Sequence, residues 1–377
     1  MSRKAVSVAI IQTQAENAGA QVISRILAED LEGKGYAIHQ IFLYRRTKSF
    51  DSSAQVVFCS PKRPSNPFQV IACLVRLYRV LHRIRPDVVV CFQHYGNVLS
   101  APIARLARAP AFVANQVSAA DVVAPAIRIA DRLLGSLAFY DKIVVNSNPA
   151  SSGYENYPRR YKKRIVCIEH GFPQRKISLT KEEARKVLGI PEGWVTLGCA
   201  ARLHPLKQLD SAIALLPLQP KWRLVLAGQG GDQPRLMRMA EEWGVAHRVD
   251  FLGELDATEM NAFLASLDCF VFPSAAETFG LAPVEAAEAG VPVVANKLEI
   301  LREVLSVDGA PCAVFVDVRD TAQFASTVEG LLNGHELKAE LRAASEKLGR
   351  RYPRATMVDS YAALLNSLIG EAACESE

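Results

Sequence analysis

Short apolar runs that alternate with helix-like segments constrain the fold of this chain more than any other feature. Two segments of residues 1–170, Gly19–Gly33 and Phe68–Ile84, place apolar residues at helical spacing. Strands that alternate with helices form parallel, helix-covered sheets, because a parallel pair needs a long crossover connection. We therefore predict an α/β domain over residues 1–170. Its strand-like runs are Val6–Gln12, Tyr36–Leu43, Val56–Cys59, Asp87–Phe92, Ala111–Ala114, Lys142–Val145 and Arg164–Ile168.

A second series of the same kind follows residues 171–180, where Gly and Pro interrupt the pattern and predict a linker. We predict a second Rossmann-like domain over residues 181–352, and a final helix within 353–377 that returns to the first domain. Two doubly wound domains of this kind face each other across a cleft, and ligands bind beyond the carboxyl ends of their strands. The strand-like runs are Val195–Ala200, Arg223–Ala227, Val249–Leu252, Cys269–Phe272, Val291–Ala295 and Ala313–Val316. The helix-like segments are Gln208–Leu216, Gln233–Trp243, Thr258–Leu267, Ala282–Ala289, Ala322–Leu332, Glu336–Leu348 and Met357–Ile369.

Composition excludes several classes of protein. Half of the 377 residues are hydrophobic and 22% are charged, which indicates packed cores instead of disorder. No apolar run approaches the roughly 18 residues of a membrane-spanning helix. The first apolar run ends at Gln12 without a small-residue cleavage pattern, so we interpret it as a strand and not as a signal peptide. The eight cysteines form no CxxC pair, so we expect reduced thiols and a cytoplasmic protein without a zinc site.

Charge divides the chain into a basic and an acidic part. Residues 1–175 hold 24 Lys and Arg against 11 Asp and Glu, although the whole chain carries only +5. The basic part includes Arg76, Arg79 and Arg83 along one helical face, and a second run at Arg159–Arg164. It predicts peripheral contact with the anionic inner face of the cytoplasmic membrane. A solvated basic surface is the alternative, and nucleic acid is disfavoured because no recognition motif accompanies the charge.

The clearest motif reads strand, turn, helix and strand from Phe272 to Ala295. Glu277 lies in the turn and Glu285 in the first turns of the helix. The backbone amides of residues 278–281 would point from the helix N-terminus toward a phosphate. Carboxylates beside such a site suit sugar hydroxyl groups that flank a diphosphate. The alternative is that Glu285 interacts only with the helix dipole and that Glu277 is solvated.

Basic residues and glycine turns occupy the other strand ends. Arg202 and Lys207 follow one strand and could clamp a diphosphate, although either alone could be a surface cation. Gly228 follows the next strand, where a glycine-rich turn lets backbone approach a ligand. In the first half, His94 ends a buried strand and could contact a substrate hydroxyl or be purely structural. The segment between the first strand and helix lacks GxGxxG, which disfavours a dinucleotide-dependent oxidoreductase.

Together these motifs resemble the family-four retaining glycosyltransferases of the GT-B fold, most clearly over residues 195–300. The resemblance implies that Glu277 binds donor-sugar hydroxyls and that Arg202 and Lys207 hold the diphosphate. This family needs no divalent metal, and the chain has no DxD triplet. We therefore expect neither metal nor other cofactor, the nucleotide sugar being a substrate. The matching features are Glu277 and Glu285 after Phe272-Pro-Ser, Arg202 with Lys207, Leu252-Gly253, and Pro292–Ala295.

The resemblance also implies that residues 1–170 form the acceptor-side Rossmann-like domain and residues 181–352 the nucleotide-sugar-binding one. It further implies which residues are catalytic and which bind the donor. Glu285 would accept hydrogen bonds from ribose, Gly19 would let backbone approach the phosphate, and His94 would lie close to the donor sugar. The implied catalytic residues are Glu277, Arg202, Lys207 and His94. The implied donor-binding residues are Glu285, Gly19, Thr278, Phe279, Gly280, Leu281, Gly228, Leu252 and Gly253.

These expectations predict a retaining hexosyltransferase of polysaccharide biosynthesis. It would move a sugar from a nucleoside-diphosphate sugar, with UDP as the expected nucleotide, to an acceptor hydroxyl on a glycan or lipid-linked glycan of the bacterial cell envelope. Two alternatives stay open at this stage. One is a nucleotide-sugar epimerase of the same fold, and the other is a nucleotide-sugar-binding subunit without turnover.

Overall fold

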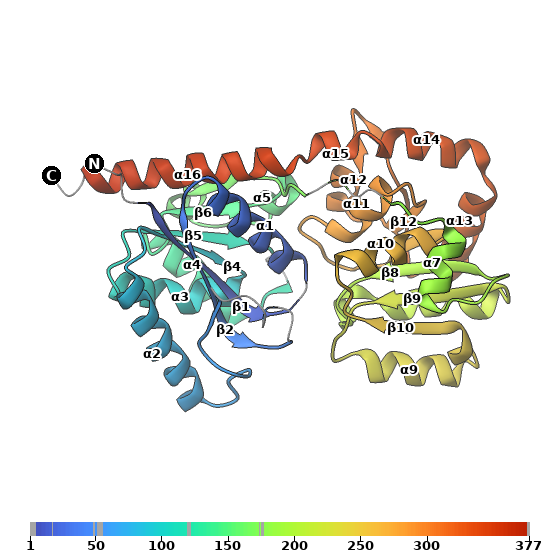
Figure 1. The fold of residues 1–377 in the computed structure, drawn as a ribbon, viewed down its shortest axis with the longest axis horizontal. Coiled ribbons are helices and arrows are strands. Elements are labelled where there is room, and N and C mark those ends of the chain that lie inside the picture. The colour runs from blue at the N-terminus through green and yellow to red at the C-terminus, as the bar shows by residue number, and fades with distance from the viewer. Residues whose placement is uncertain are drawn as a thin grey trace. The chain divides into compact units, whose positions relative to one another are not determined.

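The computed structural model describes residues 5–16, 18–47, 50, 56–118, 122–172, 174 and 177–374. The chain forms two compact units (Figure 1): unit 1 comprises Met1–Phe172 with Tyr352–Glu377, and unit 2 comprises Pro173–Arg351. Each unit holds a parallel sheet with helices against it, which confirms the predicted α/β fold class. Of the expected linker, residues 173, 175 and 176 lie outside the described residues, as do residues 1–4 and 375–377 at the chain ends.

In the described part of unit 1, seven parallel strands lie in the order β3-β2-β1-β4-β5-β6-β7. Central β4 is buried at all five residues, as its run of valines predicts for a strand covered on both faces. Val8 of β1 pairs with Ile38 on one side and with Val88 on the other. The strands are β1 (Ser7–Ala15), β2 (Ala37–Arg45), β3 (Val56–Phe58), β4 (Val88–Phe92), β5 (Ala111–Gln116), β6 (Lys142–Val145) and β7 (Ile165–Cys167).

Helices of unit 1 follow the strands, and their ends have local causes. The Asn66 side chain caps the long helix α2 by accepting a hydrogen bond from the Gln69 amide. The same helix ends at Arg85, which is left-handed with φ of 48° and precedes Pro86. The helices are α1 (Gly19–Gly33), α2 (Pro67–Ile84), α3 (His94–Leu106), α4 (Pro125–Ser136), α5 (Asn148–Ser152) and α6 (Arg159–Lys162).

The C-terminal helix α16 (Arg354–Cys374) belongs to unit 1, where it lies against α1 (Figure 1). Arg354 Nε lies 2.6 Å from Asp30 Oδ2 on α1. Further along the helix, the Tyr361 hydroxyl donates to Asn115 Oδ1 at 2.5 Å, inside the unit. An ion pair and a buried hydrogen bond therefore attach the last helix to the unit that begins the chain.

Unit 2 contains six parallel strands in its described part, in the order β10-β9-β8-β11-β12-β15. Strands β8 and β11 are direct neighbours in the sheet, although two other strands, β9 and β10, lie between them in the sequence. A short antiparallel pair, β13 (Ser306–Val307) with β14 (Ala310–Pro311), lies outside the main sheet. The six strands are β8 (Val195–Ala200), β9 (Trp222–Ala227), β10 (Val249–Gly253), β11 (Cys269–Phe272), β12 (Val293–Asn296) and β15 (Val314–Val316).

The helices of unit 2 differ from expectation at several places, since α7 (Lys181–Leu188) and α12 (Glu299–Val304) had no predicted counterpart. The helix expected over Gln208–Leu216 is interrupted: α8 spans only Leu209–Ile213, and a separate 3-10 turn, η3 (Leu216–Leu218), contains Pro217. The α-helices are α7 (Lys181–Leu188), α8, α9 (Gln233–Glu242), α10 (Ala257–Ser266), α11 (Leu281–Glu288), α12 (Glu299–Val304), α13 (Thr321–Asn333), α14 (His335–Ser345) and α15 (Leu348–Arg351). The other 3-10 turns are η2 (Pro205–Lys207) and η4 (Ala246–Arg248).

Helices α3 and α4 had no counterpart in the sequence-based expectation. Pro102 and Gly96 lie inside α3, and both residues weaken a helical pattern. In α4 the usual pattern is inverted, because Asp131 and Gly135 are buried whereas Ile129 and Leu133 are exposed. Within the described residues, no helix has the length and apolar character needed to cross a membrane.

Candidate functional site

An ion pair joins the ends of two neighbouring strands in unit 2. Lys207 follows β8 and Glu277 follows β11, and their Nζ and Oε1 atoms lie 2.5 Å apart although 70 residues separate them. The Lys207 ammonium also lies 5.8 Å from the centre of the Phe272 ring. The two side chains are 21% and 12% exposed, so solvent screens the pair only in part. Two of the predicted catalytic residues are thus in direct contact.

Backbone contacts fix the loops that carry this pair. The carbonyl of Leu206 accepts hydrogen bonds from the Ala275 amide at 2.8 Å and from the Ser274 hydroxyl at 3.4 Å. The Ser274 carbonyl in turn accepts from Asn296 Nδ2 at 2.9 Å, at the end of the next strand, β12. Three neighbouring strand ends therefore hold Lys207 and Glu277 in register with each other.

Cys199 lies beneath the pair, at the end of β8. It is fully buried, and burial raises the pKa of its thiol to about 12. Lys207 lowers that pKa and Glu277 raises it, so the thiol senses both charges. A thiol with this pKa stays protonated near neutral pH and is an unsuitable nucleophile.

Glycine turns pack against the loop that carries Arg202. Gly228 has φ of +125°, and a Cβ there would lie 2.1 Å from the Ala201 carbonyl oxygen. A Cβ at Gly230 would lie 2.0 Å from the carbonyl oxygen of Leu203. The Gly228 amide donates to the Gly253 carbonyl at 2.6 Å, and Gly253 has φ of +76°. Predicted residues Gly228, Leu252 and Gly253 are therefore gathered beside residues 201–203.

The turn after Glu277 leads directly into α11. Thr278 and Phe279 are buried, and Gly280 takes the left-handed conformation with φ of 82° at the helix N-terminus. This backbone conformation favours glycine, and a Cβ at Gly280 would in addition lie 2.6 Å from Leu301 Cδ2, the movable end of a side chain. Leu281 starts the helix, and Glu285 lies half-buried one turn further along. The structure thus places Arg202, Lys207, Glu277 and Glu285 all in unit 2.

Gly19, the first residue of α1, lies in unit 1. A Cβ built there would meet no atom within 4 Å, and its backbone needs no left-handed conformation. Nothing in the described fold therefore requires glycine at this position, in contrast to Gly228 and Gly280.

His94 is buried at the end of β4 and the start of α3, with 1% of its surface exposed. Its Nε2 atom lies 3.0 Å from the Tyr154 hydroxyl, and burial lowers the pKa of the imidazole to about 4. His94 is therefore neutral near pH 7. Gln93, just before it, has φ of 73°, a strained value for a residue with a side chain.

A buried polar network beside His94 was not foreseen from the sequence. The Asp131 carboxylate accepts hydrogen bonds from Gln116 Nε2 at 2.8 Å, and from the hydroxyls of Tyr140 at 3.1 Å and Tyr161 at 2.7 Å. Burial raises the pKa of Asp131, and these three hydrogen bonds lower it. No local pattern in the sequence predicts this network, because its members come from segments that are distant in the chain.

Comparison with known proteins finds a family model that matches most of unit 2. Residues 180–348 match the family model described as glycosyl transferases group 1. This part of the chain is therefore similar to group 1 glycosyl transferases. The matched segment holds every predicted site residue of unit 2, among them the Lys207–Glu277 pair.

Curated relatives match this chain over part of their length. The lipopolysaccharide core biosynthesis mannosyltransferase LpsB of Rhizobium meliloti is 34% identical over 152 residues, which cover 37% of this chain and 43% of LpsB. The O-antigen biosynthesis glycosyltransferase WclY of Escherichia coli is 31% identical over 166 residues, covering 44% of this chain and 46% of WclY. This chain thus spans less than half the length of these relatives.

Solved structures match the fold of both units. HepE of Anabaena, crystallised with UDP and glucose, superposes with a TM-score of 0.81 and 18% identity, over 96% of this chain and 99% of HepE. WaaG, a glycosyltransferase involved in lipopolysaccharide biosynthesis, gives a TM-score of 0.74 and 17% identity, over 95% and 99% of the two chains. These matches confirm the predicted GT-B fold class.

Proposed function

We propose that this chain is a retaining glycosyltransferase. It transfers a sugar from a nucleoside-diphosphate sugar, with UDP as the nucleotide, to an acceptor hydroxyl on a glycan or lipid-linked glycan of the bacterial cell envelope. The group 1 match and the names of LpsB and WclY support this class of reaction. The observation that carries the proposal is the contact between Lys207 and Glu277, because it joins a diphosphate-binding cation to a sugar-binding carboxylate.

In the proposed reaction, the bond between the anomeric carbon and the diphosphate oxygen breaks. The acceptor oxygen forms a bond to that carbon on the same face, and the acceptor proton passes to the leaving phosphate oxygen. Lys207 and Arg202 offset the negative charge that develops on the diphosphate. This scheme needs no metal or other cofactor, because the two cations take the part that a metal plays elsewhere.

Glu277 and Glu285 have separate tasks in this scheme. Glu277 accepts hydrogen bonds from hydroxyls of the transferred sugar while its ion pair with Lys207 holds the carboxylate in place. Glu285, one turn into α11, accepts from the ribose hydroxyls. The amides at Thr278–Leu281 face the donor at the start of the helix, and the turns at Gly228 and Leu252-Gly253 contact the nucleotide.

Unit 1 contributes two further groups. Gly19 lets the backbone approach a phosphate, which is consistent with the open space around its Cα. His94 interacts with the donor sugar as a neutral imidazole, since burial keeps its pKa far below 7. Its hydrogen bond with Tyr154 fixes the orientation of the ring.

Unit 1 also makes peripheral contact with the inner face of the cytoplasmic membrane. On α2, Phe68 is 82% exposed, and Ile71 and Val75 are exposed one and two turns later. On α4, Ile129 and Leu133 are exposed in the same way, and α3 packs between these two helices. Apolar side chains on a strongly basic unit fit an anionic bilayer surface.

Vesicle co-sedimentation tests this membrane contact. Phe68→Ser with Ile71→Ser should reduce binding to phosphatidylglycerol vesicles several-fold, whereas Val187→Ser in unit 2, an equally exposed apolar residue, should not. Binding that is unchanged by the double substitution, or equal on neutral and anionic vesicles, would rule the contact out.

The experiment for the function itself starts with the donor. A thermal-shift screen of nucleotide sugars identifies the ligand, because binding to the folded state alone raises the melting temperature. Transfer to an acceptor saccharide is then measured, together with a reaction without acceptor. Nucleotide release that requires acceptor supports a transferase, whereas a changed sugar nucleotide without acceptor indicates an epimerase. A chain that binds the donor and turns over nothing is a binding subunit, and the proposal is wrong.

A further inference from the structure

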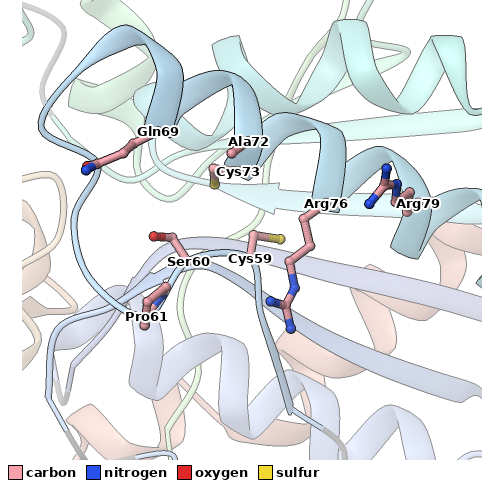
Figure 2. Close-up of a pocket in the computed structure, with 8 residues that line it drawn as sticks. All are labelled: Cys59, Ser60, Pro61, Gln69, Ala72, Cys73, Arg76 and Arg79. Carbon is pink, nitrogen blue, oxygen red and sulfur yellow. The ribbon is translucent and has the colours of Figure 1, made fainter.

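Unit 1 contains a cavity that has no part in the site described above. It lies between the segment after β3 and the first half of α2, and its volume is about 510 Å³ (Figure 2). This volume falls within the range of small-molecule pockets, which is roughly 300–1,000 Å³. The lining residues are Cys59, Ser60, Pro61, Gln69, Ala72, Cys73, Arg76 and Arg79.

Positive charge alone lines this cavity. Arg76 and Arg79 are its charged residues, and within the described residues neither guanidinium has an ion-pair or hydrogen-bond partner. The sequence explains why, since residues 52–86 contain no Asp or Glu but six Lys and Arg. Figure 2 shows the Arg76 side chain extending from α2 toward the segment that carries Cys59 and Ser60. Two guanidinium groups without local acids favour an anionic ligand.

The neutral lining adds one donor and a carbon-rich wall. Gln69 Oε1 accepts hydrogen bonds from the Ser65 amide at 2.9 Å and the Ser65 hydroxyl at 3.1 Å. This fixes the side chain and leaves its amide nitrogen as a donor for a ligand oxygen. Pro61 and Ala72, with the thiols of Cys59 and Cys73, form the uncharged wall. Cys73 Sγ also lies 3.2 Å from the Leu43 carbonyl oxygen.

We propose that this cavity binds a phosphoryl group carried by the acceptor saccharide. The two arginines hold the phosphate oxygens, Gln69 donates a further hydrogen bond, and the neutral wall contacts the carbon skeleton of the sugar. The assignment to the acceptor rests on the proposed function, because unit 1 is its acceptor-side unit. The same phosphoryl chemistry occurs in a soluble sugar phosphate and in a lipid-linked one. The experiment therefore includes both sources.

Equilibrium binding of a soluble probe to the full chain, with no donor present, tests the site. Glucose 6-phosphate is titrated calorimetrically, with glucose as the uncharged reference. Loss of one arginine-phosphate contact should raise the Kd about tenfold. Arg76→Ala with Arg79→Ala should therefore weaken binding by tenfold or more. Arg83→Ala, which removes one positive charge from the same helix outside the cavity, should leave Kd within about twofold.

The cavity's own thiols provide a second readout that does not depend on affinity alone. Because Cys59 and Cys73 are buried, the exposure to iodoacetamide is extended until their alkylation is measurable by peptide mass spectrometry. Glucose 6-phosphate should then slow the alkylation of these two thiols and should not slow that of the exposed Cys167. Protection of none of the three, or equal protection of all, overturns the proposal. A loss of binding in Arg83→Ala as large as in the double variant also overturns it, because the effect is then general electrostatics.

A vesicle arm separates the two sources of phosphate. If phosphatidylglycerol vesicles bind in an Arg76- and Arg79-dependent manner and glucose 6-phosphate does not bind or compete, the arginines serve the membrane surface and the cavity proposal fails. Competition between the two probes supports one phosphoryl site that takes either source. Because no donor is used, cavity binding without sugar transfer refutes the proposed function. The phosphoryl site then stands, but its assignment to the acceptor does not. Sugar transfer without cavity binding refutes the cavity inference and leaves the proposed function standing.

Discussion

Replacement of Lys207 by Met removes the charge at the junction of β8 and β11 while it keeps most of the side-chain volume. The partner atoms lie 2.5 Å apart, and the two side chains are 21% and 12% exposed. Unit charges about 4 Å apart interact by about 4 kcal/mol at an effective dielectric constant near 20. Lost hydration offsets part of that energy. We therefore expect the free energy of unfolding to fall by about 1–3 kcal/mol.

The effect of Lys207→Met on transfer should be larger than its effect on stability. The ammonium would stabilise charge on the departing diphosphate, and removal of one such group lowers kcat by roughly 10²–10³-fold. Steady-state kinetics with the identified donor and acceptor measures this loss. Calorimetric unfolding measures the stability of the same preparation.

Lys181→Met is the matched control for this substitution. Lys181 Nζ lies 2.6 Å from Asp268 Oδ1, and Asp268 also accepts from the Thr196 amide at the opposite ends of β8 and β11. The control removes an ion pair from the same strands without touching the proposed donor site, so kcat should be unchanged. A Lys207→Met enzyme with kcat within threefold of the wild type would refute the reasoning. Equal losses in both variants would also refute it.

Three further predictions concern single residues. Glu277→Gln should abolish transfer but leave the Kd of free UDP within about threefold, whereas Glu285→Gln should weaken UDP binding itself. Titration calorimetry measures UDP binding to both variants, and the opposite pattern would reverse the roles of the two residues. Gly228→Ala should destabilise the chain by about 2 kcal/mol or more, because the new Cβ would lie 2.1 Å from a carbonyl oxygen. Gly231→Ala is the control, because a Cβ there would meet no atom within 4 Å. Equal melting temperatures of the two variants would contradict this prediction. Because burial lowers the pKa of His94 to about 4 from an ordinary value near 6.5, its contribution to stability is present above pH 6.5 and lost as pH falls toward 4. Between pH 7 and pH 4.5, the free energy of unfolding of His94→Gln should therefore fall by roughly 2–3 kcal/mol less than that of the wild type, as measured by denaturant titration. Identical pH profiles would show that His94 is not the titrating group.

The sequence predicts strands and amphipathic helices where one face of an element is consistently apolar. The all-apolar run of β4 and the spacing in α1 follow that rule, and both were predicted. Helix α4 breaks it, because it buries Asp131 and exposes Ile129. The buried carboxylate is satisfied by hydroxyl and amide groups from distant segments, which no local pattern reveals.

The sequence could place each candidate motif at a strand end, but it could not predict how the side chains lie relative to one another. Each motif could be placed at a strand end, and carboxyl ends of parallel strands share one edge of a sheet. The contact between Lys207 and Glu277 depends in addition on β8 and β11 being neighbours, which is decided by the pairing order of the whole sheet. The burial of His94 against Tyr154 likewise joins residues 60 apart, and the sequence contains no signal for that pairing.

The anomeric configuration of the product tests the central claim most directly. The chain is incubated with the UDP-sugar identified by thermal shift and with its acceptor, and the new linkage is examined by proton NMR. The account predicts a product with the anomeric configuration of the donor and one UDP released for each sugar transferred. An inverted product, or a nucleotide sugar that is bound but neither consumed nor transferred, would contradict it.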